Sequence, residues 1–199
     1  MHNMFYYSDG QKYPLEFECT RRMNLEFQNN TCMESPGCLY VKSSTDTQAI
    51  IKNNTFKNIY GVSRSVVRSD NAVLNFTNNK VENCSTSTLL EIGNGFDHVI
   101  KLNNFTSNSG ISCLLKIGTL FDKDKFILAP DNYWGDANST TIKQKICDFY
   151  LNVAVARVKL QFHFSDPSME NETLTSIDNE DKFDDKSTEQ LRGKHYFRP

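Results

Sequence analysis

Few residues in this chain have the types and spacing that a catalytic or metal-binding site requires. The four histidines are scattered and show no metal-ligand spacing; they are His2, His98, His163 and His195. Glycoside hydrolysis needs paired carboxylates, and no paired Asp motif or Gly-His-Gly phrase occurs. Arg64 and Arg68 are able to face outward near one another, but the pattern offers no acidic partner for them. We therefore interpret them as surface charges and not as site residues. The sequence therefore predicts no catalytic residue, no metal site and no cofactor.

Two acidic segments are explained more simply by solvent exposure than by cation binding. Residues 122–125 read Asp-Lys-Asp-Lys, which is typical of a loop between regular elements. The longer segment, residues 168–189, is acidic and polar, and its acidic residues include Asp178, Glu180, Asp181, Asp184 and Asp185. Because it has too few large apolar residues to pack, we interpret it as a solvated linker.

The elements that must position any site come from an internal repeat. A phrase that opens with Asn-Asn or Asp-Asn begins at residues 29, 53, 78, 103 and 131. By subtraction, successive copies are 24, 25, 25 and 28 residues apart. A second phrase keeps the same period, because Leu-Leu-Glu-Ile-Gly at 89–93 recurs as Leu-Leu-Lys-Ile-Gly at 114–118. Two independent columns with one period indicate a stacked repeat protein.

The period and the short apolar stretches favour a right-handed parallel β-helix with about 25 residues per coil. Repeats of paired helices need about 33 residues or more, and the leucine-rich pattern is absent. Recurring Asn side chains would form a ladder along the stack, and we assign this ladder to Asn54, Asn79, Asn104 and Asn132. The fourth copy admits an offset of one residue, because Leu102 and Phe105 suit inward positions. Phe56 and Val81 are predicted to point into the core.

The six cysteines allow several pairings. Cys32 and Cys38 flank a Pro-Gly turn that could bring them together. Cys84 and Cys113 lie in adjacent coils, although their phases in the repeat differ by about four residues. For Cys19 and Cys147 the pattern offers no partner, and for every cysteine a small buried hydrophobic role stays open.

Seven Asn-x-Ser/Thr sequons favour an extracellular location. They begin at Asn29, Asn53, Asn75, Asn83, Asn104, Asn138 and Asn171. Three lie in or beside the predicted ladder and are doubtful acceptors (Asn29, Asn53 and Asn104). The better glycosylation candidates are Asn75, Asn138 and Asn171. The formal net charge of −2, without a basic cluster, argues against binding to nucleic acid.

Residues 1–15 lack the apolar region of a signal peptide, and no apolar run approaches the roughly 18 residues of a membrane span. Either the chain is cytoplasmic with idle sequons, or it is a fragment of a larger secreted chain. We favour the second interpretation. Residues 1–167 are then a β-helix with its closure, residues 168–190 an acidic linker, and residues 191–199 the possible start of a next β-helix segment.

The closure of the solenoid is predicted at residues 138–167. Asn138 or Ser139 would cap an amphipathic helix from about Thr140 to Tyr150, and an alternating strand would end at Pro167. Together with the Asn-Tyr-Trp-Gly sequence at 132–135, these features resemble the closing element of extracellular β-helix proteins, including bacterial surface β-helices. The resemblance is strongest to the bark beetle (Anakonda) family of transmembrane proteins of animal tricellular junctions, and it covers about residues 53–167.

This resemblance implies a non-enzymatic module of a cell-surface ectodomain, a glycoprotein that acts in cell–cell adhesion or junction organisation. Its partners would be other cell-surface chains or glycans, and it would reach a membrane only through a longer parent chain. The alternative function is that of a carbohydrate-active enzyme or glycan-binding module of the pectate-lyase-like class, because parallel β-helices also host such proteins.

Overall fold

A computed structural model of the chain describes residues 4–5, 13–95, 97–119, 126–135, 138–148 and 155–161. The described residues belong to one compact unit that ends at residue 163. Asn171, the predicted linker at 168–190 and the predicted next segment at 191–199 lie outside the described residues, as do His2, His163 and His195.

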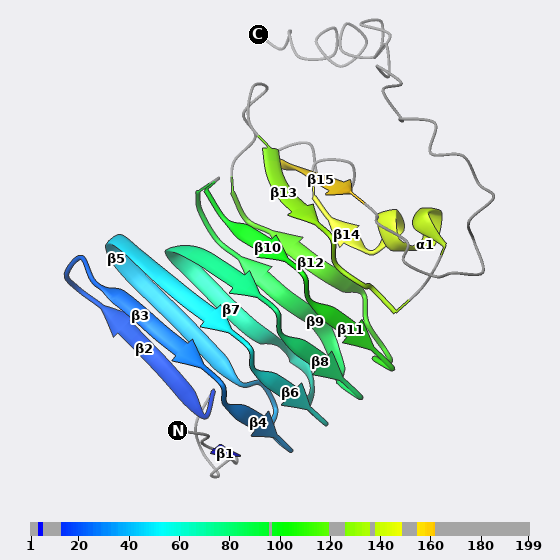
Figure 1. Ribbon diagram of the computed structural model, residues 1–199, viewed down its shortest axis with the longest axis horizontal. Coiled ribbons are helices and arrows are strands. Elements are labelled where there is room, and N and C mark those ends of the chain that lie inside the picture. Colours follow the sequence, from blue (N-terminus) through cyan, green and yellow to red (C-terminus); the bar gives the residue numbers. More distant parts are fainter. Residues whose placement is uncertain are drawn as a thin grey trace, which may run out of the picture. The chain divides into compact units, whose positions relative to one another are not determined.

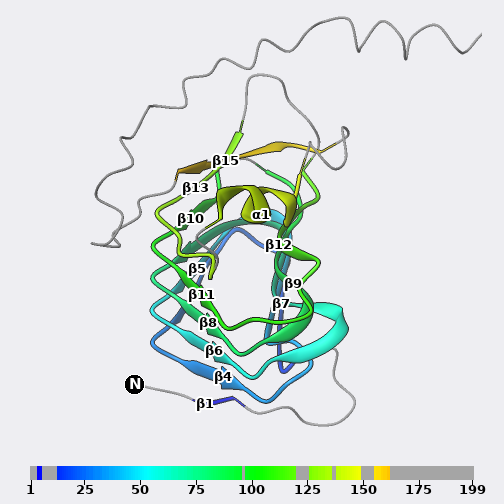
Figure 2. The ribbon, with the colours of Figure 1, turned by 90° about the vertical axis from the view of Figure 1, so that its right-hand side faces the viewer.

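The parallel β-solenoid predicted from the sequence is confirmed (Figure 1). The described elements are, in order, β1 (Met4–Phe5), β2 (Leu15–Cys19), β3 (Asn24–Gln28), β4 (Thr31–Met33), β5 (Leu39–Lys52), β6 (Thr55–Lys57), β7 (Tyr60–Thr77), β8 (Lys80–Glu82), β9 (Ser85–Ile92), β10 (Val99–Lys101), β11 (Asn104–Thr106), β12 (Cys113–Ile117), β13 (Phe126–Pro130), α1 (Ser139–Gln144), β14 (Ile146–Cys147) and β15 (Arg157–Gln161). In a second view, successive coils repeat the same outline, each displaced from the one before it (Figure 2).

Two parallel sheets line the coils. The short strands form a five-stranded sheet in the order β1-β4-β6-β8-β11. The ten-stranded sheet has two parts, and the long strands β5 and β7 belong to both. The first halves of β5 and β7 pair with β2 and β9 in what we call the first lane, which continues to β12 and β14. Their second halves pair with β3 and β10 in the second lane, which continues to β13 and β15. The register follows the repeat: Phe56 lies opposite Val81, and Leu90 lies opposite Leu115.

The core is a column of aromatic rings, with one ring contributed by each successive coil. The ring centroids of Phe27, Phe56, Phe76, Phe105 and Trp134 follow one another at 6.5, 5.9, 6.4 and 4.6 Å. Phe56 and Val81 are fully buried, which confirms their predicted inward orientation. Because one coil cannot bury this column alone, the coils stabilise one another by stacking.

A ladder of Asn side chains runs beside the aromatic column, and it differs from the predicted ladder at one position. Asn54, Asn79 and Asn132 belong to it, but Asn104 does not, so that assignment is wrong. Asn104 is exposed at the start of β11, and the buried Asn103 occupies the ladder position. In the other coils the left-handed residue is the first residue of the Asn-Asn or Asp-Asn pair, but in this coil it is Leu102, one residue before the pair. The ladder residue of this coil is therefore Asn103 and not Asn104.

Each rung binds the next coil in the same way. The backbone N–H groups of Asn30, Asn54, Asn79 and Asn103 donate to the Oδ1 atom of the following ladder residue at 2.9, 2.9, 2.9 and 3.0 Å. The Nδ2 groups of Asn54, Asn79, Asn103 and Asn132 donate to buried backbone carbonyls, each at 2.8 Å. The ladder therefore satisfies backbone groups that the turn would otherwise leave unpaired.

Left-handed turns lie at both ends of the short strands β4, β6, β8 and β11. Before the strand, positive φ angles occur at Asn29 (57°), Asn53 (55°), Asn78 (54°), Leu102 (58°) and Asp131 (56°). After it, they occur at Glu34 (55°), Asn58 (54°), Asn83 (53°) and Ser107 (54°). Asn tolerates this conformation better than most residues, which explains why the chain is rich in Asn-Asn pairs.

The structure pairs four cysteines in two disulfides. Cys32–Cys38 is present, with 6.2 Å between the Cα atoms. The candidate pair of Cys84 and Cys113 is wrong, because Cys113 is bonded to Cys147, at a Cα–Cα distance of 5.6 Å. Cys147 lies in β14, which pairs directly with β12. Cys84 is a buried free thiol, as is Cys19, and burial raises the pKa of Cys84 to about 12.

The closing helix is shorter than predicted. α1 begins after Asn138, whose Oδ1 atom accepts from the backbone N–H groups of Thr140 and Thr141. It ends at Gln144, because Ile146 and Cys147 leave the helix to pair with β12. The side chains of Ile142 and Ile146 are both buried against the end of the coil interior.

Candidate functional site

The first lane of the large sheet carries a column of outward polar residues. In register across β2, β5, β7, β9 and β12, this column consists of Glu16, Tyr40, Arg68, Glu91 and Lys116. A second outward column beside it contains Glu18, Lys42 and Asp70. We call these eight residues the polar face. Stacking places them on a rigid support about 4.8 Å apart from coil to coil.

Arg68 is the centre of the polar face. Its Nε atom lies 3.2 and 3.1 Å from the two carboxylate oxygens of Asp70, and its Nη2 atom lies 2.9 Å from Oδ2. Its Nη1 atom lies 3.9 Å from the Oε2 atom of Glu91. The expectation that Arg68 has no acidic partner is therefore wrong, because its partners come from its own strand and from the next coil.

Tyr40 supports the same carboxylate from the preceding coil. Its hydroxyl donates to the Oδ2 atom of Asp70 at 2.7 Å, and the guanidinium carbon of Arg68 lies 5.2 Å from the centre of its ring. Burial, followed by the hydrogen bond to Asp70, raises the pKa of Tyr40 to about 12. Tyr40 therefore remains a hydrogen-bond donor at any physiological pH.

Glu91 connects Arg68 to the coil above. Its Oε1 atom lies 2.9 Å from the Nζ atom of Lys116, and its Oε2 atom lies 3.2 Å from the hydroxyl of Ser65. Ser65 is in turn 3.3 Å from the hydroxyl of Tyr13. The network thus crosses four coils, from Tyr40 through Arg68 and Glu91 to Lys116.

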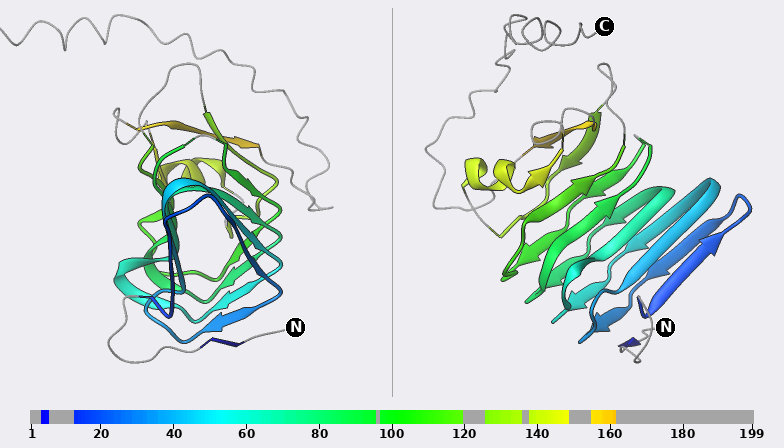
Figure 3. Two further views of the ribbon diagram at one scale, coloured as in Figure 1. Left: turned by 90° about the vertical axis from the view of Figure 1, so that its left-hand side faces the viewer. Right: turned by 180° about the vertical axis from the view of Figure 1, so that it is seen from behind.

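Glycine makes room for the network at the end of the repeated Leu-Leu-Glu-Ile-Gly phrase. A Cβ atom at Gly93 would lie 3.1 Å from the Cα atom of Asp70 and 3.3 Å from its carboxylate. Beside the network, the register of β7 shifts between Gly61 and Ser65, and this part of β7 bulges away from the stacked strands (Figure 3). Arg64 lies within this bulge, apart from the column that contains Arg68.

The arrangement is suited to recognition. Asp70 accepts hydrogen bonds from two side chains, and Glu91 is paired with Lys116 and lies close to Arg68. The side chains of Arg68 and Lys116 remain 39% and 51% exposed, so their remaining N–H groups are available to a partner. Planar guanidinium groups on a fixed support bind carboxylates, sulfates and sugar hydroxyls with defined geometry.

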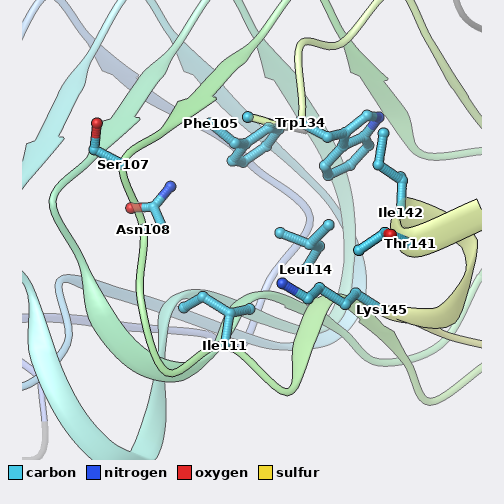
Figure 4. A pocket seen from close by; sticks show the side chains of 10 residues that line it. Phe105, Ser107, Asn108, Ile111, Leu114, Trp134, Thr141, Ile142 and Lys145 are labelled. Atoms are coloured by element: carbon cyan, nitrogen blue, oxygen red, sulfur yellow. The ribbon is translucent and has the colours of Figure 1, made fainter. Parts of the chain in front are cut away.

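A cavity of about 180 Å³ lies beside α1, which contributes Thr141 and Ile142 to its lining. Its walls combine apolar side chains, among them Phe105, Leu114 and Trp134, with polar ones from Asn108 and Thr141. Lys145 extends toward Leu114 at its edge (Figure 4). Among the described residues that line it, Lys145 carries the one charge. We interpret the cavity as space left by the packing of the closing element.

Comparisons with protein-family models, with curated proteins and with solved structures give no match. Function must therefore be argued from the chain's own residues. Within the described ranges, no group of His, Cys, Asp and Glu side chains has the arrangement of a metal site. In the same ranges, no helix is long and apolar enough to cross a membrane.

The remaining candidate residues are dispersed. His98 is buried, and its Nδ1 atom accepts from the backbone N–H of Leu74 at 3.0 Å. Burial lowers the pKa of His98, which favours the neutral ring. Asn75 is half-buried in β7, and Asn138 is exposed at the start of α1. The sequence did contain a signal for the polar face, because Arg68, Glu91 and Lys116 hold the same place in the repeat.

Proposed function

We propose that this chain is a non-enzymatic extracellular β-solenoid module that binds another cell-surface chain or its glycans through the polar face. The network of Tyr40, Arg68, Asp70 and Glu91 is the observation that carries this proposal. It occupies a rigid surface, it is held by charge-assisted hydrogen bonds, and it leaves cationic N–H groups exposed.

The two disulfides support the extracellular part of the proposal. Disulfides persist in oxidising compartments and are rare in the cytosol. Cys113–Cys147 closes a loop of 34 residues and ties the closing element to the last coil. Within an ectodomain, such a module would act in cell–cell adhesion or junction organisation, as the resemblance at residues 53–167 implies.

The test is saturable binding of the disulfide-bonded chain to the surface of epithelial cells. Arg68→Gln should weaken binding about tenfold, because a hydrogen bond to a charged group contributes roughly 1.5–3 kcal/mol and 1.4 kcal/mol corresponds to a tenfold change. The matched control is Lys101→Gln, which removes an exposed cation from β10 on the other lane and should leave binding unchanged. Equal binding by both variants, or no saturable binding at all, would contradict the proposal.

Pretreatment of the cells separates the two partner classes. Enzymatic removal of surface glycans should abolish binding if the partner is a glycan, and mild proteolysis should abolish it if the partner is a protein chain. A partner that survives both treatments is neither of these and would also contradict the proposal.

The second candidate function is carbohydrate-active chemistry, and one observation favours it. Asp70 and Glu91 place two carboxylates on either side of Arg68 on an outward sheet surface. Hydrolases use carboxylate pairs, and lyases use carboxylates together with a basic residue. Turnover of an acidic polysaccharide that disappears in both Asp70→Asn and Glu91→Gln would establish this function in place of the first.

A further inference from the structure

The sequons beside the Asn ladder, which the sequence marked as doubtful acceptors, begin at exposed residues. Asn29 and Asn53 each precede a ladder residue, and the ladder residues Asn30 and Asn54 are buried. Asn29 and Asn53 themselves are exposed, on the left-handed turns before β4 and β6. Their neighbours along the chain turn inward to form the ladder, so these two side chains point away from the coil.

Two further sequons lie at the same sheet. Asn83 is exposed on the left-handed turn that follows β8. Asn104 is exposed in β11, in an outward column with Lys80 and Tyr133. Four acceptors in four successive coils therefore border the sheet formed by β4, β6, β8 and β11 (Figure 1). We call this sheet, with the turns at both ends of its strands, the short-strand edge.

The other surfaces differ from the short-strand edge. Asn75 is half-buried in the second lane, in register with Ile50 and Val99. Its Oδ1 atom is buried and has no hydrogen-bond partner among the described residues. The strands that carry the polar face contain no Asn at 15–19, 39–43, 65–70, 88–93 or 113–117. No sequon can therefore begin on those parts of the first lane.

From this geometry we infer that the short-strand edge is N-glycosylated, at Asn83, at Asn104 and at either Asn29 or Asn53, and that the polar face is left bare for its partner. The inference rests on the extracellular function proposed above. The reaction joins the Nδ2 atom of Asn to the anomeric carbon of an oligosaccharide carried by a lipid diphosphate. The lipid diphosphate leaves, and the Nδ2 group gives up one proton.

Spacing decides between Asn29 and Asn53. They occupy equivalent places in adjacent coils, and adjacent coils lie about 4.8 Å apart. An N-linked glycan is bulky compared with that separation. A glycan on one of the two residues therefore obstructs transfer to the other. Asn83 and Asn104 lie in other columns and are free of this constraint.

The experiment uses the full chain secreted from a eukaryotic cell behind a cleaved signal peptide. Release of N-glycans by a glycosidase in oxygen-18 water labels each formerly occupied Asn, and peptide mass spectrometry measures the occupancy. We expect high occupancy at Asn83 and Asn104, shared occupancy at Asn29 and Asn53, and little at Asn75.

Variants at the third sequon position test the spacing argument without disturbing the left-handed turns. Thr31→Val removes the sequon at Asn29 and should raise the occupancy of Asn53 about twofold, because the obstructing glycan is gone. Thr55→Val should raise the occupancy of Asn29 in the same way. Thr173→Val, which removes the sequon at Asn171, is the control and should change neither.

Occupied Asn75 with all four edge acceptors empty would overturn the inference while leaving the extracellular function intact. Full occupancy of Asn29 and Asn53 on the same molecules would overturn the spacing argument. A chain that enters the secretory pathway but forms neither disulfide would overturn the proposed function itself, and the inference with it.

Discussion

The short-strand edge and the polar face are built on the same coils, but they use the repeat differently. At the short-strand edge the same chemistry recurs in every coil, as a left-handed turn, an inward Asn and an inward apolar residue. On the polar face the register recurs while the residue type changes, from Glu16 to Tyr40, Arg68, Glu91 and Lys116. Columns of the same residue type stabilise the stacking of the coils, whereas a column of different residue types can form a surface that is specific for one partner.

The largest expected effect on stability lies in the aromatic column. Phe56 is fully buried between Phe27 and Phe76, so Phe56→Ala should lower the free energy of unfolding by about 3–5 kcal/mol. Urea titration measures the change. Tyr60→Ala, at a ring that is 48% exposed, is the control and should cost only about 0.5 kcal/mol. Equal losses in the two variants would show that the column is not the core.

The ladder should come next, and adjacent asparagines provide a matched pair. Asn103 accepts from the backbone N–H and Nδ2 of Asn79 and donates to the carbonyl of Phe76 and to Asn132. Asn103→Ala leaves buried groups unpaired and should cost about 3 kcal/mol in urea unfolding. Asn104→Ala changes an exposed side chain and should stay within about 0.5 kcal/mol. The reverse order would restore the originally predicted ladder.

A smaller effect, of opposite sign, is expected where the repeat is broken. Leu102 is 52% exposed and holds a left-handed conformation that costs most L-residues about 1–2 kcal/mol. Leu102→Asn should therefore stabilise the chain by about 1 kcal/mol, seen as a higher midpoint in urea. The converse substitution in the preceding coil, Asn78→Leu, should destabilise it by a similar amount. A change of the same sign in both variants would refute this explanation of the Asn-rich turns.

These two regions also show what could be predicted from the sequence. The period of about 25 residues determines coil length and strand register, so Phe56 and Val81 could be assigned to the core without coordinates. The fourth rung was misplaced because Asn103 and Asn104 have the same residue type, and only the turn at Leu102 separates them. The polar face was missed because its members share a phase in the repeat but no residue type.

The closing element was the least predictable, since it departs from the repeat. Ile142 and Ile146 have the i, i+4 spacing of a helix, which favours a helix that runs past the observed end of α1 at Gln144. Pairing of Ile146–Cys147 with β12 overrides that local preference. The same pairing brings Cys147 to Cys113, a contact that no spacing in the sequence indicates. Contacts outside the repeat, such as Cys113–Cys147, depend on the three-dimensional path of the closing element, which the repeat period does not determine.

The most direct test of the central claim measures stability and binding on one variant. Arg68→Gln removes a half-exposed charge from the polar face while every repeated column stays intact. We expect its free energy of unfolding to fall by no more than about 1 kcal/mol, and its binding to the epithelial cell surface to fall about tenfold. Unchanged binding, or a loss of stability as large as that of Asn103→Ala, would show that Arg68 serves the fold and would contradict the account.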